Sequence, residues 1–344
     1  MTKIPEILLI YTGGTIGMIK DYETKALKAF DFDHLYEKIP ELNQLDCNIE
    51  AISFKEPIDS SNMNTNYWVA IVEIIETHYA KKDGFVVLTG SDTMSYTSSA
   101  VSFMIENLNK PIIFTGSQLP IGDLRTDAKE NLITAVQIAA SINQKTGEPN
   151  IKEVGLYFEY KLYRANRTTK INAEQFEAFT SPNFPPLAES GVHLKFNENI
   201  TYQNRSPKSL KIRKKLEANI VILKLFPGIT EGVVKSILNI SNIKGVILES
   251  YGSGNAPTEK WFIKLLKETL KRGVYIVDVT QCVGGSVILG QYETSVQLEK
   301  IGLISGKDIT TESAIAKLMY LLGEKIPQQK FKNIYETSLR GEIS

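Results

Sequence analysis

The sequence predicts an α/β fold with two domains, each with a mainly parallel sheet flanked by helices. Three apolar runs, at residues 7–11, 85–88 and 111–114, each lead into glycine and small polar residues. Runs that are apolar on both faces are typical of strands in a parallel sheet covered by helices on both sides. Because ligands bind outside the carboxyl ends of such strands, we expect the active site there, in the larger N-terminal domain.

Length and composition set the domain organisation. The chain has 344 residues, which is enough for two domains. A change of composition to asparagine, proline and lysine marks a connection. We therefore expect an N-terminal catalytic domain at 1–195, a linker at 196–217 and a C-terminal α/β domain at 218–344.

Charge and cysteine content exclude several classes of protein. The 39 basic and 39 acidic residues cancel, which argues against nucleic-acid or anionic-membrane partners. No apolar run reaches the length of a membrane span, and Pro5 and Glu6 interrupt the N-terminus in a way that does not fit an export signal. Two distant cysteines, Cys47 and Cys282, fit a reducing cytoplasm. The three histidines have no metal-ligand spacing, so we expect no metal and no cofactor.

The other elements follow from periodicity and breaker residues. Residues 18–25 are charged and aperiodic, and are either a lid beside the site or an ordinary surface loop. Apolar spacing near 3.6 predicts helices, and short β-branched runs predict strands. The expected helices are 31–39, 95–108, 132–142, 261–270 and 314–322, and the further expected strands are 49–55, 154–158, 220–225, 245–248 and 274–279.

The loop after the first strand contains Gly13, Gly14 and Thr15, and three interpretations are open. It is a structural turn, a phosphate cradle, or a turn that presents a hydroxyl nucleophile. Both common nucleotide fingerprints are missing, which weakens the second interpretation. Two further strand ends repeat the pattern of Thr-Gly and small polar groups, and one parallel sheet would bring all three to the same edge.

Two other polar segments have both a structural and a functional interpretation. Residues 59–62 are good helix caps, and the same helix N-terminus is a ready anion site. The basic stretch at 161–170 is more often a solvated face or a structural arginine network than a binding site.

Taken in order, these segments resemble the signatures of the bacterial type I (cytoplasmic) L-asparaginases over nearly the whole chain. The matching segments are 11–18, 59–61, 90–94, 115–118, 163–170, 250–257 and 280–282. The resemblance implies hydrolysis of L-asparagine to L-aspartate and ammonia through an acyl-enzyme on Thr15. It also implies self-assembly into a homodimer or homotetramer.

The resemblance further implies roles for individual residues. The catalytic residues that it implies are Thr15, Ser91, Asp92 and Lys170. The substrate-binding residues that it implies are Asp59, Ser60, Ser61, Ser91, Asp92, Ser117 and Asn255, the last reaching a neighbouring subunit's site.

The sequence departs from the family pattern at three places. Ser91 stands where the family usually has threonine, so the methyl group that restricts χ1 is lost. The family's lid tyrosine has no clean counterpart, and Tyr22 is the only tyrosine nearby. Glu249 replaces an arginine of the asparagine-activated site of some relatives. Because a carboxylate repels the effector's own carboxylate, we expect weak or absent activation by asparagine.

Three alternatives remain open. One is the asparaginase-like subunit of a transamidosome that releases ammonia from glutamine. Such proteins carry an extra N-terminal domain, for which we expect no room before the first signature at Tyr11. A second is an asparagine sensor that binds without releasing ammonia. A Rossmann nucleotide-binding protein is the third, and the missing fingerprint argues against it.

Overall fold

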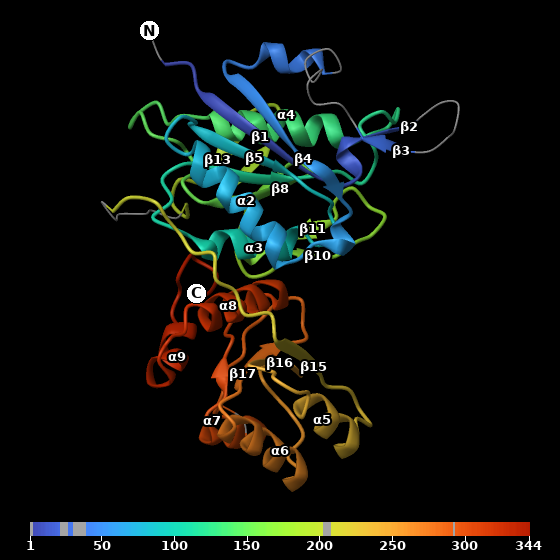
Figure 1. The fold of residues 1–344 in the computed structure, drawn as a ribbon, viewed down its shortest axis with the longest axis vertical. Helices are drawn as coiled ribbons and strands as arrows, with labels where there is room; N and C mark the ends of the chain where they lie inside the picture. Colours follow the sequence, from blue (N-terminus) through green and yellow to red (C-terminus); the bar gives the residue numbers. More distant parts are fainter. Residues whose placement is uncertain (1–2, 21–26, 30–38, 202–207, 292) are drawn as a thin grey trace. The chain divides into compact units, whose positions relative to one another are not determined.

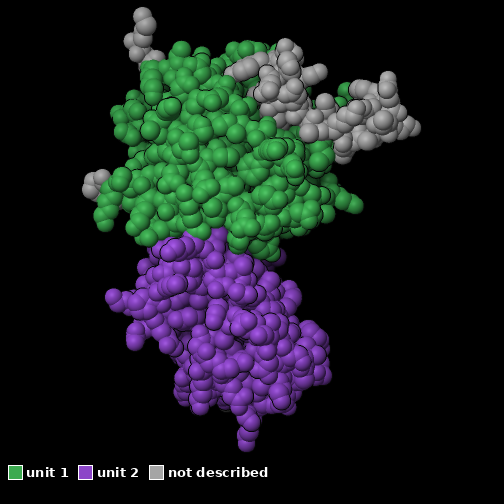
Figure 2. Space-filling view, viewed as in Figure 1, with its two compact units in different colours: residues 1–214 green, residues 215–344 purple. Residues whose placement is uncertain are grey.

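The computed structural model describes residues 3–20, 27–29, 39–201, 208–291 and 293–344. The chain forms two compact units, residues 1–214 and 215–344 (Figure 2). Each unit has a mainly parallel sheet with flanking helices, which confirms the predicted fold class. Most of the candidate lid, including Tyr22, and most of the helix expected at 31–39 lie outside the described residues.

Unit 1 contains an eight-stranded sheet. Its spatial order is β13 (Leu194–Phe196), β12 (Ala188–Ser190), β9 (Lys161–Arg164), β8 (Val154–Phe158), β7 (Ile112–Thr115), β5 (Gly84–Leu88), β1 (Glu6–Gly13) and β4 (Asn48–Ile58). The strands from β8 to β4 are parallel, whereas β9, β12 and β13 continue the sheet antiparallel.

Helices cover both faces of this sheet, which explains why its central strands are apolar throughout. Helix α4 (Ala128–Ala140) packs on one face, against alternate side chains that include Ile7, Leu9 and Tyr11. Helices α2 (Thr65–His78) and α3 (Met94–Met104) lie across the opposite face (Figure 1). Side chains on both faces of β1 are therefore buried, as expected for a covered parallel sheet.

Short elements connect the main ones. Helix α3 ends at Met104, earlier than the expected residue 108, because the next residue, Ile105, is extended (φ −108°, ψ 112°). The chain then forms β6 (Ile105–Glu106), which pairs antiparallel with β14 (Lys211–Ile212) from the segment expected to be a linker. The remaining short elements are β2 (Met18–Lys20), β3 (Leu27–Ala29), β10 (Thr169–Lys170), β11 (Phe179–Thr180), η1 (Thr15–Gly17), η3 (Pro40–Gln44), η4 (Ser60–Asn62) and η5 (Ala165–Arg167).

Unit 2 has a four-stranded parallel sheet, in the order β15 (Ile220–Lys224), β16 (Gly245–Ser250), β17 (Tyr275–Thr280) and β18 (Ile304–Ser305). Its helices are α5 (Glu231–Leu238), α6 (Lys260–Lys271), α7 (Glu293–Ile301), α8 (Thr311–Gly323) and α9 (Gln328–Tyr335). Helices α5, α6 and α7 contribute to one apolar cluster with the sheet, whereas α8 packs separately on β16 and β17. Among the described residues, no helix combines the length and apolar character needed to cross a membrane.

Asp278 is a carboxyl side chain buried inside unit 2 without a hydrogen-bond donor or a positive charge paired with it among the residues that the structure describes. It lies on β17 with no exposed surface, and within the described residues neither oxygen accepts a hydrogen bond. Burial raises the pKa of Asp278 to about 7. The neighbouring Ser250 hydroxyl opposes this only in part, because it donates instead to the Val279 carbonyl oxygen at 3.4 Å. The fold therefore favours the protonated side chain.

Replacing Asp278 by asparagine is expected to change the pH dependence of stability. Since the folded pKa of about 7 exceeds the ordinary value of 3.8, the folded state holds this proton more tightly than the unfolded state. The stability contribution is complete below about pH 4 and is lost as the pH rises through about 7. Relative to the unmodified protein, Asp278→Asn should gain roughly 2–3 kcal/mol in unfolding free energy between pH 5 and pH 8.

Urea denaturation at the two pH values measures this gain. Asp46→Asn, the same substitution at an exposed position, is the control against which the gain at Asp278 is measured. Equal differences for Asp278→Asn at pH 5 and pH 8 would show that Asp278 does not carry the effect.

Candidate active site

Three loops follow neighbouring parallel strands of unit 1 and lie side by side. Strand register aligns Tyr11 of β1 with Leu88 of β5, and Leu88 with Thr115 of β7. The first loop begins η1 at Thr15, the second leads from β5 into α3, and the third follows β7. The three strand ends predicted to meet at one edge are therefore adjacent.

Glycines let the loops touch backbone to backbone. A Cβ atom at Gly14 would collide with the backbone of Gly90, and one at Gly13 with the backbone of Ile58. A Cβ atom at Gly90 would lie 2.5 Å from Ser60 Oγ, and one at Gly116 would lie 2.5 Å from the Thr89 carbonyl oxygen. Gly13 and Gly14 also have positive φ, 135° and 89°, which side-chain-bearing residues rarely adopt. These contacts join the three loops and η4 into one site.

The buried side chain of Tyr11 holds the first loop in place through hydrogen bonds. Its hydroxyl lies 3.2 Å from the Gly17 carbonyl oxygen and 3.4 Å from that of Gly14, to which it donates. Burial raises the pKa of Tyr11 to about 12, so the hydroxyl remains a neutral donor. Thr15 is half-buried, and its hydroxyl makes no hydrogen bond within the described part of the chain. The side chain is therefore presented without a partner of its own among these residues.

Lys170 joins the second loop to β10. Its ammonium donates to Ser91 Oγ at 2.9 Å and to Asp92 Oδ1 at 2.7 Å. The other Asp92 oxygen accepts a long hydrogen bond from Ser60 Oγ at 3.5 Å. The Lys170 side chain is only 17% exposed, compared with 68% for Asp92. A largely covered ammonium is thus in contact with a hydroxyl and a carboxylate at the strand ends.

Asp59 and its neighbours form the start of η4. The Asp59 carboxylate accepts hydrogen bonds from Ser61 Oγ at 2.7 Å and from the Ser61 amide at 2.8 Å, and both lower the pKa of Asp59. The side chain is therefore anionic at neutral pH. Thr93 Oγ1 donates to the Ser60 carbonyl oxygen at 2.9 Å and ties this segment to the second loop. Both predicted interpretations, helix cap and binding surface, are compatible with this geometry.

The N-terminal end of helix α4, with its N-cap residue Asp127, holds the third loop in place through hydrogen bonds. The Asp127 carboxylate accepts from the backbone amides of Gln118 at 2.9 Å and Leu119 at 3.1 Å. Asn131 Nδ2 donates to the Gly116 carbonyl oxygen at 3.0 Å. Ser117 is buried, and its hydroxyl donates to the Leu119 carbonyl oxygen at 2.6 Å. The Ser117 hydroxyl is therefore engaged within its own loop.

The structure brings together most of the residues that the sequence singled out. Direct contacts link Ser60, Ser91, Asp92 and Lys170, and the Gly14–Gly90 contact joins the Thr15 loop to them. Asn255 belongs to unit 2, where it pairs with Tyr251, and its role toward a substrate stays a prediction. The sequence alone assigned no role to Tyr11 or Gln118, although both lie inside the segments that match the family signatures.

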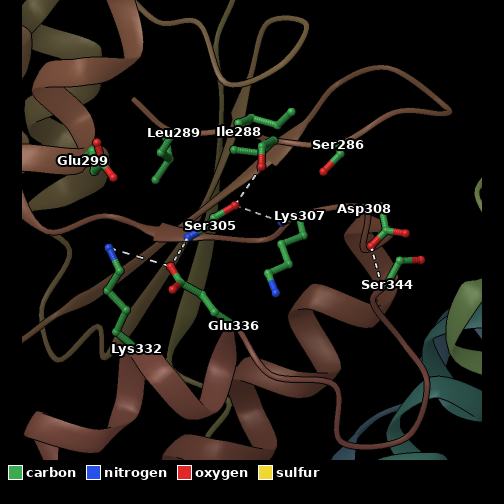
Figure 3. Close-up of a pocket in the computed structure, with 11 residues that line it drawn as sticks. Ser286, Ile288, Leu289, Glu299, Ser305, Lys307, Asp308, Lys332, Glu336 and Ser344 are labelled. Carbon is green, nitrogen blue, oxygen red and sulfur yellow. Dashed lines mark hydrogen bonds and ion pairs between the residues drawn. The ribbon is translucent and has the colours of Figure 1, made fainter. Parts of the chain in front are cut away.

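Unit 2 contains Glu249 and a separate pocket. Glu249 forms an ion pair with Lys224 at 3.0 Å and accepts a hydrogen bond from Thr311 Oγ1 at 2.9 Å. Its negative charge is therefore already paired within unit 2. A cavity of about 490 Å³ lies near β18. Figure 3 shows the side chains that line it. Its polar side chains include Lys332 and Glu336, which pair at 3.7 Å, and none of the predicted site residues lines it. Among the described residues, no cluster of metal-ligating side chains is present in either unit.

Comparisons with known proteins agree with this two-domain fold. The family model "Asparaginase, N-terminal" matches residues 6–202, and "Glutaminase/Asparaginase C-terminal domain" matches residues 219–335. The two units thus define a two-domain protein of the glutaminase/asparaginase class. The chain belongs to the asparaginase family, as its signatures predicted.

Individual relatives match over nearly the whole chain. L-asparaginase 1 of Escherichia coli strain K12 is 40% identical over 98% of both chains. The crystal structure of L-asparaginase I from Vibrio cholerae O1 biovar eltor superposes with a TM-score of 0.90 at 37% identity, covering 99% of this chain and 100% of that one. The thermostable L-asparaginase from Thermococcus kodakarensis superposes with a TM-score of 0.88 at 30% identity, covering 98% of this chain and 99% of that one.

Gly90→Ala tests whether backbone contact between the loops builds the site. The added methyl group would lie 2.5 Å from Ser60 Oγ and 2.6 Å from Ser60 Cβ, so the second loop or η4 must move. We expect about 1–3 kcal/mol of destabilisation from this overpacking. We also expect at least a ten-fold loss of amidase activity, since a displacement of about 1 Å can reduce turnover 100-fold.

Gly191→Ala is the matched control, because nothing lies within 4 Å of its added methyl group. Melting temperature and initial rates of ammonia release should be unchanged in this variant. Full activity and stability in Gly90→Ala would contradict the steric argument.

Proposed function

We propose that this protein is an L-asparaginase, which hydrolyses L-asparagine to L-aspartate and ammonia through an acyl-enzyme on Thr15. The observation that carries the proposal is the juxtaposition of the Thr15 loop with the Lys170–Ser91–Asp92 contacts. Membership of the asparaginase family and full-length similarity to L-asparaginase 1 support it. No cofactor is needed for this chemistry.

In the first step the Thr15 hydroxyl oxygen attacks the side-chain carboxamide carbon. The carbon–nitrogen bond then breaks, an ester forms on Thr15, and ammonia leaves with the proton that Thr15 has lost. A free hydroxyl is a weak nucleophile near neutral pH, so a neighbouring group must help to remove its proton. Ser91 is suited to relay the proton. Its oxygen accepts from Lys170, and its own hydrogen makes only a long bond of 3.5 Å to Gln118 Oε1, which it can exchange for the leaving group.

In the second step water attacks the ester, releases aspartate and restores the Thr15 hydroxyl. The Lys170 ammonium supplies positive charge beside the reacting groups in a largely covered position. Backbone amides of the strand-end loops provide the oxyanion site, and one such donor is worth roughly 3–4 kcal/mol of barrier when it is preorganised.

Ionic groups around the loops fit the two charges of a free amino acid. The Asp59 and Asp92 carboxylates bind the substrate's α-ammonium, and the lowered pKa of Asp59 keeps it anionic for this purpose. The α-carboxylate binds at the Ser60–Ser61 segment, at the start of η4. Ser61 Oγ, which donates to Asp59 in this structure, must then turn to the α-carboxylate. Ser117 and a neighbouring subunit's Asn255 complete the proposed binding set.

A cytoplasmic location is supported by two free thiols, at Cys47 and Cys282, as expected in a reducing compartment. Assembly as a homodimer or homotetramer is part of the proposal because Asn255 would serve a neighbouring site.

Removing the Thr15 hydroxyl should abolish turnover. We expect Thr15→Ala to release ammonia from L-asparagine roughly 1,000-fold or more slowly than the unmodified protein. Thr15→Ser, which keeps a hydroxyl, should retain measurable activity. Thr146→Ala changes an exposed turn threonine and should leave the rate unaltered. Ammonia release at the normal rate by Thr15→Ala would exclude Thr15 as the nucleophile.

The second expected property is a preference for asparagine over glutamine. An extra methylene in a fitted pocket costs about 1–3 kcal/mol, which corresponds to roughly 5- to 150-fold in kcat/KM. Coupled assays of ammonia release with each amide give the two constants directly. Near-equal values would contradict the preference and would favour an ammonia-supplying glutaminase.

A further inference from the structure

Gln118 connects two parts of the candidate site that lie far apart in sequence. Its Nε2 atom donates to the Gln175 carbonyl oxygen at 2.9 Å, and its Oε1 atom accepts from Ser91 Oγ at 3.5 Å. Gln175 lies five residues after Lys170, in the loop between β10 and β11. Three contacts therefore link Lys170, Ser91, Gln118 and Gln175 through three chain segments, and the chain itself connects Lys170 to Gln175.

The orientation of the Gln118 side chain follows from its partners. A backbone carbonyl oxygen can only accept, so the amide nitrogen must face Gln175 and the amide oxygen must face Ser91. The Gln118 backbone is held as well, by the Asp127 carboxylate at 2.9 Å. Gln118 is thus a fixed acceptor and does not need to be ordered when substrate binds.

Ser91 needs such an acceptor more than a threonine would. Its oxygen accepts from the Lys170 ammonium at 2.9 Å, so its own hydrogen must point to a different group. A serine has no γ-methyl group, and its χ1 angle is less restricted than that of threonine. At 3.5 Å the Ser91–Gln118 bond is long, so it sets the direction of the hydroxyl more than it adds energy.

We propose that Gln118 is a positioning residue that orients the Ser91 hydroxyl and ties the Lys170 segment to it, in place of the constraint that a methyl group would supply. The inference rests on the catalytic role proposed for Ser91. Gln118 itself takes no proton and forms no bond to the substrate in this account. Its loss should therefore lower kcat and leave KM nearly unchanged.

A double-mutant cycle with Ser91→Thr tests the proposal. Gln118→Met keeps the length of the side chain and removes both hydrogen bonds, and should lower kcat about five- to ten-fold. In the Ser91→Thr background the same change should cost about two-fold or less, because the methyl group again restricts χ1. Equal losses in both backgrounds would overturn the proposal, since the two residues would then act independently.

Two further variants separate positioning from general effects. Gln118→Asn keeps the amide but is one methylene too short to bridge Ser91 and Gln175, so it should lose as much kcat as Gln118→Met. Gln144→Met makes the same substitution at an exposed glutamine and should change neither constant. A large increase of KM in either Gln118 variant, with kcat unchanged, would instead assign Gln118 to substrate binding and would overturn the proposal.

Ser91→Ala distinguishes this inference from the proposed function. If Ser91→Ala loses activity while Gln118→Met retains normal kcat, the positioning role is wrong and the role of Ser91 stands. If Ser91→Ala is fully active, the proposed role of Ser91 fails, and the positioning role fails with it.

Discussion

Close backbone contact between glycines is the constraint on which the candidate site depends. Gly14 lies against Gly90, and Gly90 lies against Ser60, at separations that leave no room for a side chain. Parallel pairing of β1, β5 and β7 brings the loops to one edge, but pairing alone leaves them a strand spacing apart. The glycines let the loops fold over that edge and meet. Thr15 and Ser91, each one residue beyond such a glycine, are thereby brought into the same site.

Electrostatics then organises what packing has brought together. The Lys170 ammonium contacts Ser91 and Asp92, and Asp59 and Asp92 give the site a negative surface suited to an ammonium group. Around this centre the polar groups hold loops in place. Tyr11 supports the first loop, and Asp127 supports the third. A reacting centre of exposed and half-buried groups is thus carried by a buried frame, as expected when a rigid scaffold positions functional loops.

The sequence predicted secondary structure best where a residue pattern has a single physical cause. The strands at residues 7–11 and 85–88 could be predicted because burial on both faces requires continuous apolar runs. The pairing of β6 with β14 could not, because it joins two segments of only two residues each, about 100 residues apart. The resemblance to known signatures identified Ser91 and Lys170. It did not predict that Ser61 and Ser117 donate to their own loops, since hydroxyl direction depends on local geometry that no spacing encodes.

We propose that Thr15, and not Ser91, carries the acyl group. Acid quenching during turnover of L-asparagine, followed by peptide mass spectrometry, tests this most directly. Our account predicts an aspartyl ester on the peptide that contains Thr15, which disappears when the quenched protein is treated with hydroxylamine. An ester on the peptide that contains Ser91, with none on Thr15, would contradict it.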